Sequence, residues 1–460
     1  MNQQTHRNVD LLITGCHVVC FDPAETILEE GAIAIIGNSI AWIGKAADAP
    51  AHFAPRETLH APTRIAMPGL IDCHVHTAQQ FLHGKLQAIQ RRGELRNPMW
   101  QRYLIPFESG LTPEDVYASG LAAYSAMIRS GTTCFLEAGG PFADEMGRAA
   151  DDIGIRGRIA LSTMDTEADL PANMRCSTAE ALRRSEELVL RWKDHPRVNA
   201  WLSLRQIMVN TEALRQGMHE LSHALATPIH THLAEGTYEV DYVIARYGLR
   251  PAEYLEQLQC FDHYLHAAHS VLLSLREIDL YAQRDVSACH CALNNYRMGV
   301  PRVLEMMRRG IRLGFGTDGA ATRASLDMFQ VLHGATLGQS SVAGTPYHID
   351  PPVTHEQILH QALRGGAATA RLPDAIGSLE VGKRADIVLV GTSDPDQFPL
   401  VDPMITLAES TVGRDVQTVV IDGRIVLRDG QITTVDLAPM RAHLRSQYQS
   451  LMNRYDEAIR

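Results

Sequence analysis

Histidine and aspartate residues of this chain recur in short groups whose spacing suits metal-assisted hydrolysis. His74 and His76 stand two residues apart, and His230 and His232 repeat this spacing. Asp318 lies in the segment GTDG. Residues i and i+2 of a strand point to the same side, so each pair presents two imidazoles in one direction. Imidazole and carboxylate groups ligate catalytic zinc, which lowers the pKa of a bound water to about 7. The groups therefore predict a metal site that activates water at neutral pH.

Apolar runs end in these groups, and their alternation with helix-like stretches predicts the elements that position the groups. Eight such runs lie between Ile65 and Arg371, and each but the last is followed by a helix-like stretch. Alternating β and α units favour a parallel sheet. Eight of them fit an α/β fold, a closed (β/α)8 TIM barrel with its site at the carboxyl ends of the strands. The runs are RIAMPGLIDCHVH, GTTCFLEAG, RGRIALSTMD, VNAWLSLRQIM, TPIHTHLAE, HYLHAAHSV, DVSACHCALNN and IRLGFGTDGAA.

Four of the eight predicted strand ends carry ligand-type residues. The fifth run ends in HTHLAE, with Glu235 three residues after His232, and the sixth contains His266 and His269. A lone His-x-His is more often a polar pair than a ligand pair, and a single buried histidine is usually a hydrogen-bonded core residue. Without a common site, however, costly buried polar groups need a separate explanation at all four ends. The joint pattern therefore favours one metal site at the barrel mouth.

Both ends of the chain read as short strands joined by turns. The segments VDLLITGCHVV and GAIAIIGNSIAWIG near the start resemble ADIVLVG and VQTVVIDGRIVLRDGQIT near the end in their alternation. We therefore expect a small β-sandwich domain that both chain ends build. The expected divisions are 1–65 and 375–435 for the two parts of the sandwich, 66–374 for the catalytic barrel and 436–460 for a C-terminal helical segment.

Composition and charge exclude several classes of function. The 460 residues carry a formal net charge of −11, which argues against nucleic acid as a partner because phosphate binding needs a basic surface. Apolar stretches are too short to span a bilayer, and the start of the chain lacks an apolar signal core. The eight cysteines are scattered and read as buried free thiols. We therefore expect a cytoplasmic protein with no membrane partner.

Segments spread over nearly the whole chain resemble the amidohydrolase superfamily. The resemblance lies in its cytosine-deaminase-like branch of aminohydrolases and chlorohydrolases, which includes S-adenosylhomocysteine and 8-oxoguanine deaminases and triazine hydrolases. The segments run in the order of that family. They are MPGLIDCHVH, WQRYLIPFESGLTPEDVY with SGTT, HTHLAE, AAHSVLLS, HCALNNYRMGVP, GFGTDGAATRASLDMF and IGSLEVGKRADIVLV.

This resemblance implies one divalent metal ion and its ligands. His230 shares a strand face with His232 and competes with it, but the spacing of three residues to Glu235 matches the family and favours His232. Two-metal members use a modified lysine from the fourth strand, and the run NAWLSLRQIM has no lysine. A single ion is therefore expected, zinc in the first place and Fe²⁺ as the alternative. The implied metal ligands are His74, His76, His232 and Asp318.

The resemblance also implies three catalytic residues. Glu235 would carry a proton from the attacking water to a ring nitrogen of the substrate. His269 would contact or orient that water. Asp318 would accept a proton from it while holding the metal.

Departures from the family pattern bear on the substrate. Nucleoside deaminases of this branch commonly have a glutamate two residues before the tryptophan that corresponds to Trp100, where this chain has Pro98. A nucleoside substrate is therefore disfavoured. Arg205, Gln206 and Arg323 would favour a carbonyl-rich or anionic substrate, although a surface or loop-anchoring role for the arginines is equally open. The candidate substrate-binding residues are Gln80, Trp100, Arg205, Gln206, His290, Asn295 and Arg323.

The pattern as a whole predicts a mononuclear metal-dependent aminohydrolase, a hydrolytic deaminase of a small nitrogen heterocycle. One alternative is a hydrolase on the same scaffold that acts on a C–Cl or amide-type bond. A second alternative is a metal-free, non-catalytic homologue. The complete set of metal-ligand residues argues against this alternative. A homodimer or higher homo-oligomer is expected from the family resemblance alone.

Overall fold

The computed structural model describes residues 7–49, 53–166, 170–323, 325–344 and 352–459. Within these ranges eight parallel strands pair in chain order and confirm the predicted TIM barrel. Nearly every strand residue is buried, because side chains fill the barrel on one face and helices cover the other. Each strand lies inside one predicted run. The strands are β6 (Leu70–Val75), β7 (Thr132–Glu137), β8 (Arg156–Ala160), β9 (Val198–Leu204), β10 (Ile229–Leu233), β11 (Leu265–His269), β12 (Ser287–His290) and β13 (Leu313–Phe315).

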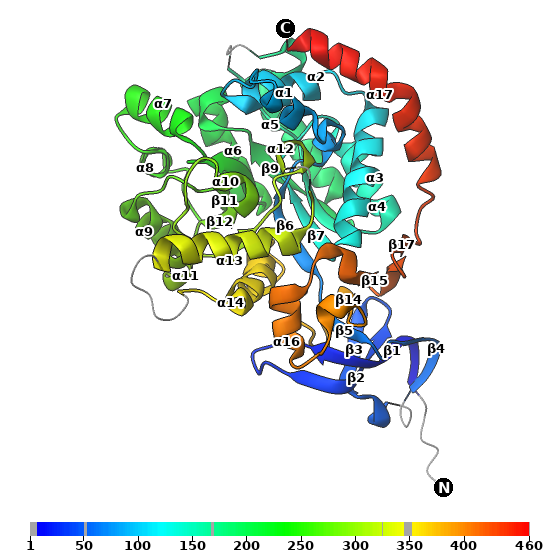
Figure 1. Cartoon of the computed structure of the whole chain (residues 1–460). Helices are drawn as coiled ribbons and strands as arrows, with labels where there is room; N and C mark the ends of the chain where they lie inside the picture. The colour runs from blue at the N-terminus through cyan, green and yellow to red at the C-terminus, as the bar shows by residue number, and fades with distance from the viewer. Residues whose placement is uncertain (1–6, 50–52, 167–169, 324, 345–351, 460) are drawn as a thin grey trace.

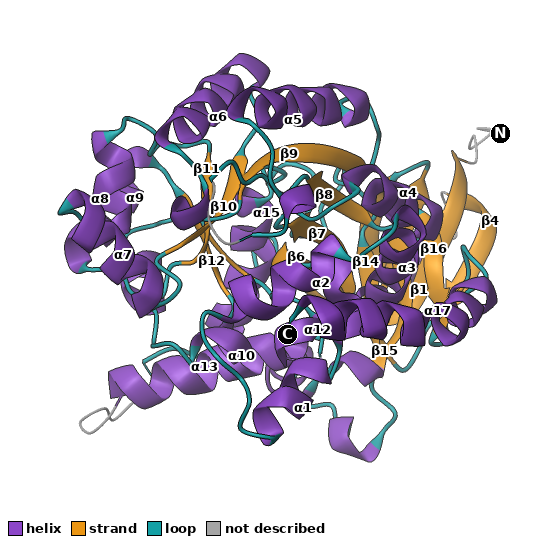
Figure 2. Cartoon of the chain, turned by 90° about the horizontal axis from the view of Figure 1, so that it is seen from above, coloured by secondary structure: helices purple, strands orange, loops and turns teal. Residues whose placement is uncertain are grey.

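Helices follow the strands and surround the barrel, as Figure 2 shows from above. Thr112, Ser177, Thr211 and Ser274 begin α3, α5, α6 and α9, and each side chain accepts a hydrogen bond from the backbone N–H three residues on. The helices are α1 (Lys85–Arg91), α2 (Ile105–Ser109), α3 (Pro113–Arg129), α4 (Ala143–Ile153), α5 (Thr178–Trp192), α6 (Glu212–Leu225), α7 (Thr237–Tyr247), α8 (Pro251–Gln257), α9 (Leu275–Arg284), α10 (Ala292–Asn295), α11 (Val303–Arg308), α12 (Ala320–Arg323), α13 (Met328–Gly344), α14 (His355–His360) and α15 (Gly366–Thr369).

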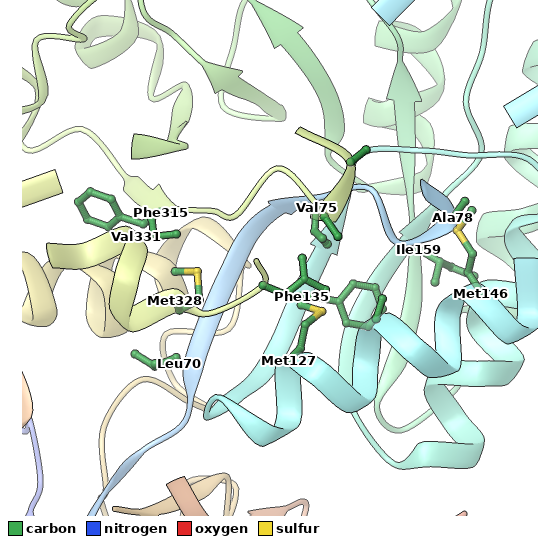
Figure 3. Packing of buried hydrophobic residues seen from close by; sticks show 14 of the residues in the cluster. Leu70, Val75, Ala78, Met127, Phe135, Met146, Ile159, Phe315, Met328 and Val331 are labelled. Carbon is green, nitrogen blue, oxygen red and sulfur yellow. The ribbon is translucent and has the colours of Figure 1, made fainter. Parts of the chain in front are cut away.

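The apolar layer between strands and helices is continuous around the barrel. Met127 of α3, Phe135 of β7 and Ile159 of β8 belong to one buried cluster with Phe315 of β13 and Val331 of α13 (Figure 3). Burying a side chain of this size contributes about 1.5–3 kcal/mol. This layer fixes the strands and therefore the positions of their carboxyl ends.

Both chain ends build the predicted β domain, which lies at one end of the barrel where blue and orange segments meet in Figure 1. Nine strands share one hydrogen-bonded sheet in the described ranges. The antiparallel pairing of β5 with β14 joins the two ends of the chain. The strands are β1 (Arg7–Val19), β2 (Ile27–Ile36), β3 (Ser39–Lys45), β4 (Phe53–His60), β5 (Arg64–Pro68), β14 (Ile387–Gly391), β15 (Val416–Ile421), β16 (Arg424–Arg428) and β17 (Gln431–Ile432).

Ion pairs attach the sheet and the last helix to the barrel. The buried Arg156 of β8 contacts Asp386 at 2.8 Å and Asp422 at 3.0 Å. The short α16 (Pro403–Ile405) precedes β15, and the long α17 (Ala438–Ala458) runs along α3, where Arg454 contacts Asp115 at 3.2 Å. No helix in the described part of the chain is both long and apolar enough to cross a membrane.

Candidate metal centre and active site

Hydrogen bonds join β6, the first barrel strand, to the segment after β13, the last barrel strand. This seam places the candidate ligands His74 and Asp318 beside each other. Asp72 of β6 accepts hydrogen bonds from the Thr317 N–H at 3.1 Å and the Thr317 hydroxyl at 2.6 Å. The Asp318 N–H donates to the His74 carbonyl at 2.9 Å. Gly316 is required here, because a Cβ at this position would lie 2.8 Å from the His74 backbone. The seam thus holds the Asp318 carboxylate against the end of β6.

Three imidazoles and one carboxylate meet at this end of the barrel. The Asp318 Oδ1 atom lies 3.2 Å from His74 Nε2 and 3.8 Å from His76 Nε2. His76 Nε2 lies 3.1 Å from His232 Nε2, which comes from β10. The ring nitrogens of the three histidines lie within 4.8 Å of one another. Side chains from three distant parts of the sequence therefore share one small volume.

Hydrogen bonds on the far side of two rings set which nitrogen faces this volume. His232 Nδ1 lies 2.8 Å from the Arg205 carbonyl, which can only accept, so Nδ1 carries the proton and Nε2 keeps its lone pair. His74 Nδ1 lies 2.8 Å from His230 Nε2. His230 therefore lies behind His74 as its hydrogen-bond partner. Of the two histidines of β10, His232 therefore faces the shared volume, whereas His230 does not.

Protonation of these rings is unfavourable in their surroundings. Burial lowers the pKa of His74, His76 and His232 well below the ordinary histidine value, and neighbouring imidazoles and Arg205 lower it further. The Nε2 atom of His74 is buried without a hydrogen-bond partner among the described residues. Neutral imidazoles with lone pairs beside a carboxylate are the donor set of a divalent metal site. The residues therefore fit a divalent metal.

Glu235 lies beside this group and is held by two donors. Its Oε2 atom accepts from Gln206 Nε2 at 2.9 Å and from the Tyr238 hydroxyl. Its Oε1 atom faces His269 Nε2 at 3.8 Å. The side chain is 14% exposed, so it borders the cavity described below. A carboxylate anchored through one oxygen keeps the other free to receive and release a proton.

His269 and Asp318 both adopt left-handed backbone conformations, with φ of 69° and 65°. This region is costly for residues other than glycine and is found at sites that the surrounding structure holds in place. The Asn295 Oδ1 atom accepts the Cys291 N–H at 2.8 Å, which turns Nδ2 toward His269 Nδ1 at 3.0 Å. Asn294 Nδ2 donates to Asp318 Oδ2 at 2.5 Å. The two asparagines of α10 therefore orient the two strained residues.

A cavity of about 370 Å³ opens next to these side chains. This size lies in the range of small-molecule sites. The Trp100 Nε1 atom lies in its wall, buried and without a hydrogen-bond partner among the described residues. The lining residues are His76, Gln90, Leu95, Asn97, Met99, Trp100, Leu104, Arg205, Gln206, His232, Glu235, Gly236, Thr237, Tyr238, His269, Asn294, Arg297, Met298, Asp318 and Thr322.

Three of the seven predicted substrate-binding residues line this cavity, namely Trp100, Arg205 and Gln206. Arg205 does not offer a free charge, however. Its Nη1 atom pairs with the buried carboxylate of Glu108 at 3.2 Å, and both side chains are almost fully buried. The guanidinium is therefore compensated and gives less support for an anionic substrate than the sequence suggested.

The remaining candidates lie elsewhere or outside the described residues. Gln80 lines a separate surface groove with residues of α17. His290 is turned away, because its ring nitrogens lie 3.1 Å from Asn295 Oδ1 and 3.3 Å from the Tyr296 hydroxyl. Asn295 contacts His269 instead of the cavity. None of these three residues lines the described cavity, and their contact with a substrate stays a prediction. The side chain of Arg323 lies outside the described residues.

Among the lining residues that sequence reasoning missed, Tyr238, Asn294 and Arg297 bear on function. Tyr238 follows Glu235 by three residues, a spacing that places it in the first turn of α7. The prediction named Asn295 and not its neighbour Asn294. Only the rotation of α10 about its axis shows that Asn294 is the one that faces Asp318. Arg297 lies at the rim, exposed, and its guanidinium has no hydrogen bond or ion pair with any described residue. The sequence feature that could have pointed to Arg297 is its positive charge two residues after the asparagine pair.

Comparisons with known proteins agree with this geometry. The family model named Amidohydrolase family matches residues 65–426. A 5-methylthioadenosine/S-adenosylhomocysteine deaminase of Desulforudis audaxviator is 31% identical over 410 residues, which are 88% of this chain and 91% of the relative. The structure of an adenosine deaminase from Xanthomonas campestris with bound zinc has a TM-score of 0.89 at 30% identity, covering 97% of this chain and 100% of that chain. A triazine hydrolase of Arthrobacter aurescens shares the fold, with a TM-score of 0.84 at 23% identity over 95% of this chain and 99% of that one. The family model covers most of the chain, and the structure brings the chain's candidate metal ligands together. This chain therefore belongs to the amidohydrolase family.

Proposed function

We propose that this member of the amidohydrolase family is a mononuclear metal-dependent aminohydrolase that replaces an exocyclic amine of a small nitrogen heterocycle with hydroxyl. The observation that carries the proposal is the meeting of His74, His76, His232 and Asp318 beside the anchored carboxylate of Glu235. These groups border one cavity at the carboxyl ends of the strands, where TIM-barrel sites lie. The deaminases among the relatives support the reaction class.

The metal is proposed to be a single zinc ion held by His74, His76, His232 and Asp318. Three imidazoles and one carboxylate suit zinc, and the related Xanthomonas campestris structure contains zinc. When bound, such an ion is a Lewis acid that makes hydroxide accessible at neutral pH. The Arg205 carbonyl holds His232 in the tautomer that this role needs, and the His230 ring lies 2.8 Å from His74 Nδ1 and orients that ring.

Glu235 is the proposed proton carrier. Its free Oε1 takes a proton as water adds to the ring carbon and gives it to the adjacent ring nitrogen. The added hydroxyl group then gives its proton to the exocyclic amine, the C–N bond breaks, and ammonia leaves as the C=O bond forms. One water is consumed for each ammonia released. Gln206 and Tyr238 hold Oε2 and thereby keep Oε1 directed at the reacting atoms.

His269 and Asp318 are proposed to stabilise the addition step. Because Asn295 Nδ2 faces His269 Nδ1 as a donor, a ring proton lies on Nε2, which faces the Glu235 side of the cavity. This N–H can donate to the oxygen that adds to the ring. Asp318 Oδ2 accepts from Asn294, which leaves Oδ1 directed at the imidazoles.

The cavity favours a free heterocycle over a nucleoside. Its described lining contains two carboxylates, Glu235 and Asp318, and both have roles in the reaction. No further carboxylate in that lining is available for a ribose diol, and Pro98 occupies the position of the missing glutamate. The Trp100 Nε1–H, Gln206 and the rim cation Arg297 instead suit a ring with carbonyl or anionic substituents.

Ammonia release from aminated purines, pterins, pyrimidines and triazines tests the proposal, with each nucleoside assayed beside its free base. We expect release from at least one free base, loss of activity on chelation and recovery with zinc. Chloride release from a chlorotriazine without ammonia release would favour the C–Cl alternative. Purified protein that takes up no metal on reconstitution would favour the metal-free alternative.

We further propose that the protein works in the cytoplasm as a homodimer or higher homo-oligomer. All eight cysteines are free and seven are buried, which suits a reducing compartment. The oligomeric state is supported by the family resemblance alone, and light scattering of the purified protein measures it directly.

A further inference from the structure

A second group of metal-ligand side chains lies outside the cavity. His219 and His223 are four residues apart on α6, so helix geometry places both imidazoles on one face. Asp262, in the segment before β11, faces them from the neighbouring connection. Its Oδ2 atom lies 3.0 Å from His219 Nε2 and 2.6 Å from His223 Nε2. None of the three residues lines the cavity of the first site.

The geometry of this group is close to that of a zinc site. The three ligand atoms lie within 4.8 Å of one another. Ligand atoms around a tetrahedral zinc ion are about 3.3 Å apart, given zinc distances of about 2.0–2.2 Å. The nitrogen–oxygen distances of 3.0 and 2.6 Å are shorter than this by about 0.3 and 0.7 Å, so side-chain rotations that widen the group admit an ion. The ring of His263, which is exposed, lies 5.8 Å from that of His223 and offers a further imidazole.

The carboxylate is held in place before any ion arrives. The Tyr264 N–H donates to Asp262 Oδ1 at 3.0 Å and leaves Oδ2 directed at the two imidazoles. The side chains of His219, Asp262 and His223 are 21%, 25% and 45% exposed, so an ion from solvent reaches them.

We infer that His219, His223 and Asp262 form a second, structural zinc site that clips α6 to the segment leading into β11. Without an ion, each Nε2 must carry a proton to donate to Asp262. A zinc ion would displace both protons and bind the same three atoms, the two Nε2 atoms and Asp262 Oδ2. Because β11 ends at His269, the clip fixes the entry to a strand of the catalytic barrel. An ion that binds only the folded chain also raises its stability.

Zinc content of the full-length protein tests this inference. After equilibration with zinc and removal of loose metal by gel filtration, we expect two equivalents in the wild type. The double variant His219→Gln/His223→Gln is expected to hold one, because glutamine keeps an N–H donor toward Asp262 but offers no imidazole. His443→Gln is the matched control, since His443 pairs with Asp115 at 3.0 Å as a single imidazole. It should hold two equivalents.

A variant of the first site separates this inference from the proposed function. Asp318→Ala removes a ligand of the proposed catalytic site only, so it should keep one equivalent and still gain thermal stability from added zinc. That gain should vanish when His219→Gln/His223→Gln is added. A wild type that holds no more than one equivalent, or a second equivalent that survives in the double variant, overturns the inference. Loss of activity in Asp318→Ala with the second equivalent retained supports both sites.

Discussion

Replacing Glu235 with glutamine removes the proposed proton carrier and leaves the proposed metal ligands in place. Glu235 Oε2 is held by Gln206 at 2.9 Å and by Tyr238, and glutamine keeps one oxygen to accept from these donors. Its amide group cannot take up a proton at neutral pH. The side chain therefore stays near its position while its chemistry is lost.

The expected loss in kcat/KM is roughly 10²–10⁴, the range for removal of a general acid–base group. At about 1.36 kcal/mol per factor of ten, this is about 3–5 kcal/mol in activation free energy. Zinc content should be unchanged, because Glu235 is not among the proposed ligands. The assay is ammonia release with the best substrate, with zinc measured on the same sample.

Tyr238→Phe is the matched control for this prediction. It removes the hydroxyl that donates to the same carboxylate but leaves the carboxylate itself. Loss of one hydrogen bond to a charged group costs about 1.5–3 kcal/mol, so we expect a smaller decrease, roughly tenfold to a hundredfold. A Glu235→Gln enzyme with full metal content and wild-type kcat/KM would refute the assigned role. A variant that lost its zinc would show that Glu235 serves the metal instead.

Three further predictions concern the metal and the barrel. Asp318→Ala should lose the catalytic ion and all activity, and activity with metal retained at that site would contradict the ligand assignment. His230→Gln should weaken zinc binding about 10–100-fold in a chelator competition, because His230 orients His74; unchanged affinity would deny it that role. Burial raises the pKa of Glu137 to about 8, against the hydrogen bonds from Thr77. The folded state therefore holds a proton that the unfolded chain releases, and the unfolding free energy should fall between about pH 5 and 8 by up to about 1.4 kcal/mol per pH unit. Urea denaturation should show a shallower decline for Glu137→Gln, and equal slopes would contradict the assignment.

The sequence by itself determined the barrel and the chemistry of its mouth. Strand runs and ligand types are local properties, because burial on both faces makes a strand apolar throughout and the two-residue period puts His74 and His76 on one side. The β domain followed in the same way from the alternation at both chain ends. The metal-type residues could therefore be predicted together before any contact was known.

Tertiary structure alone decided which neighbouring residues reach the site. His230 and His232 share a strand face, but two residues span about 6.6 Å along a strand, and only the depth of β10 in the barrel brings His232 to the mouth. Asn294 and Asn295 differ by about 100° around α10, so one contacts Asp318 and the other His269. The charge of Arg205 is compensated by Glu108, 97 residues away. Such choices depend on loop paths and on partners distant in the chain, which local periodicity does not encode.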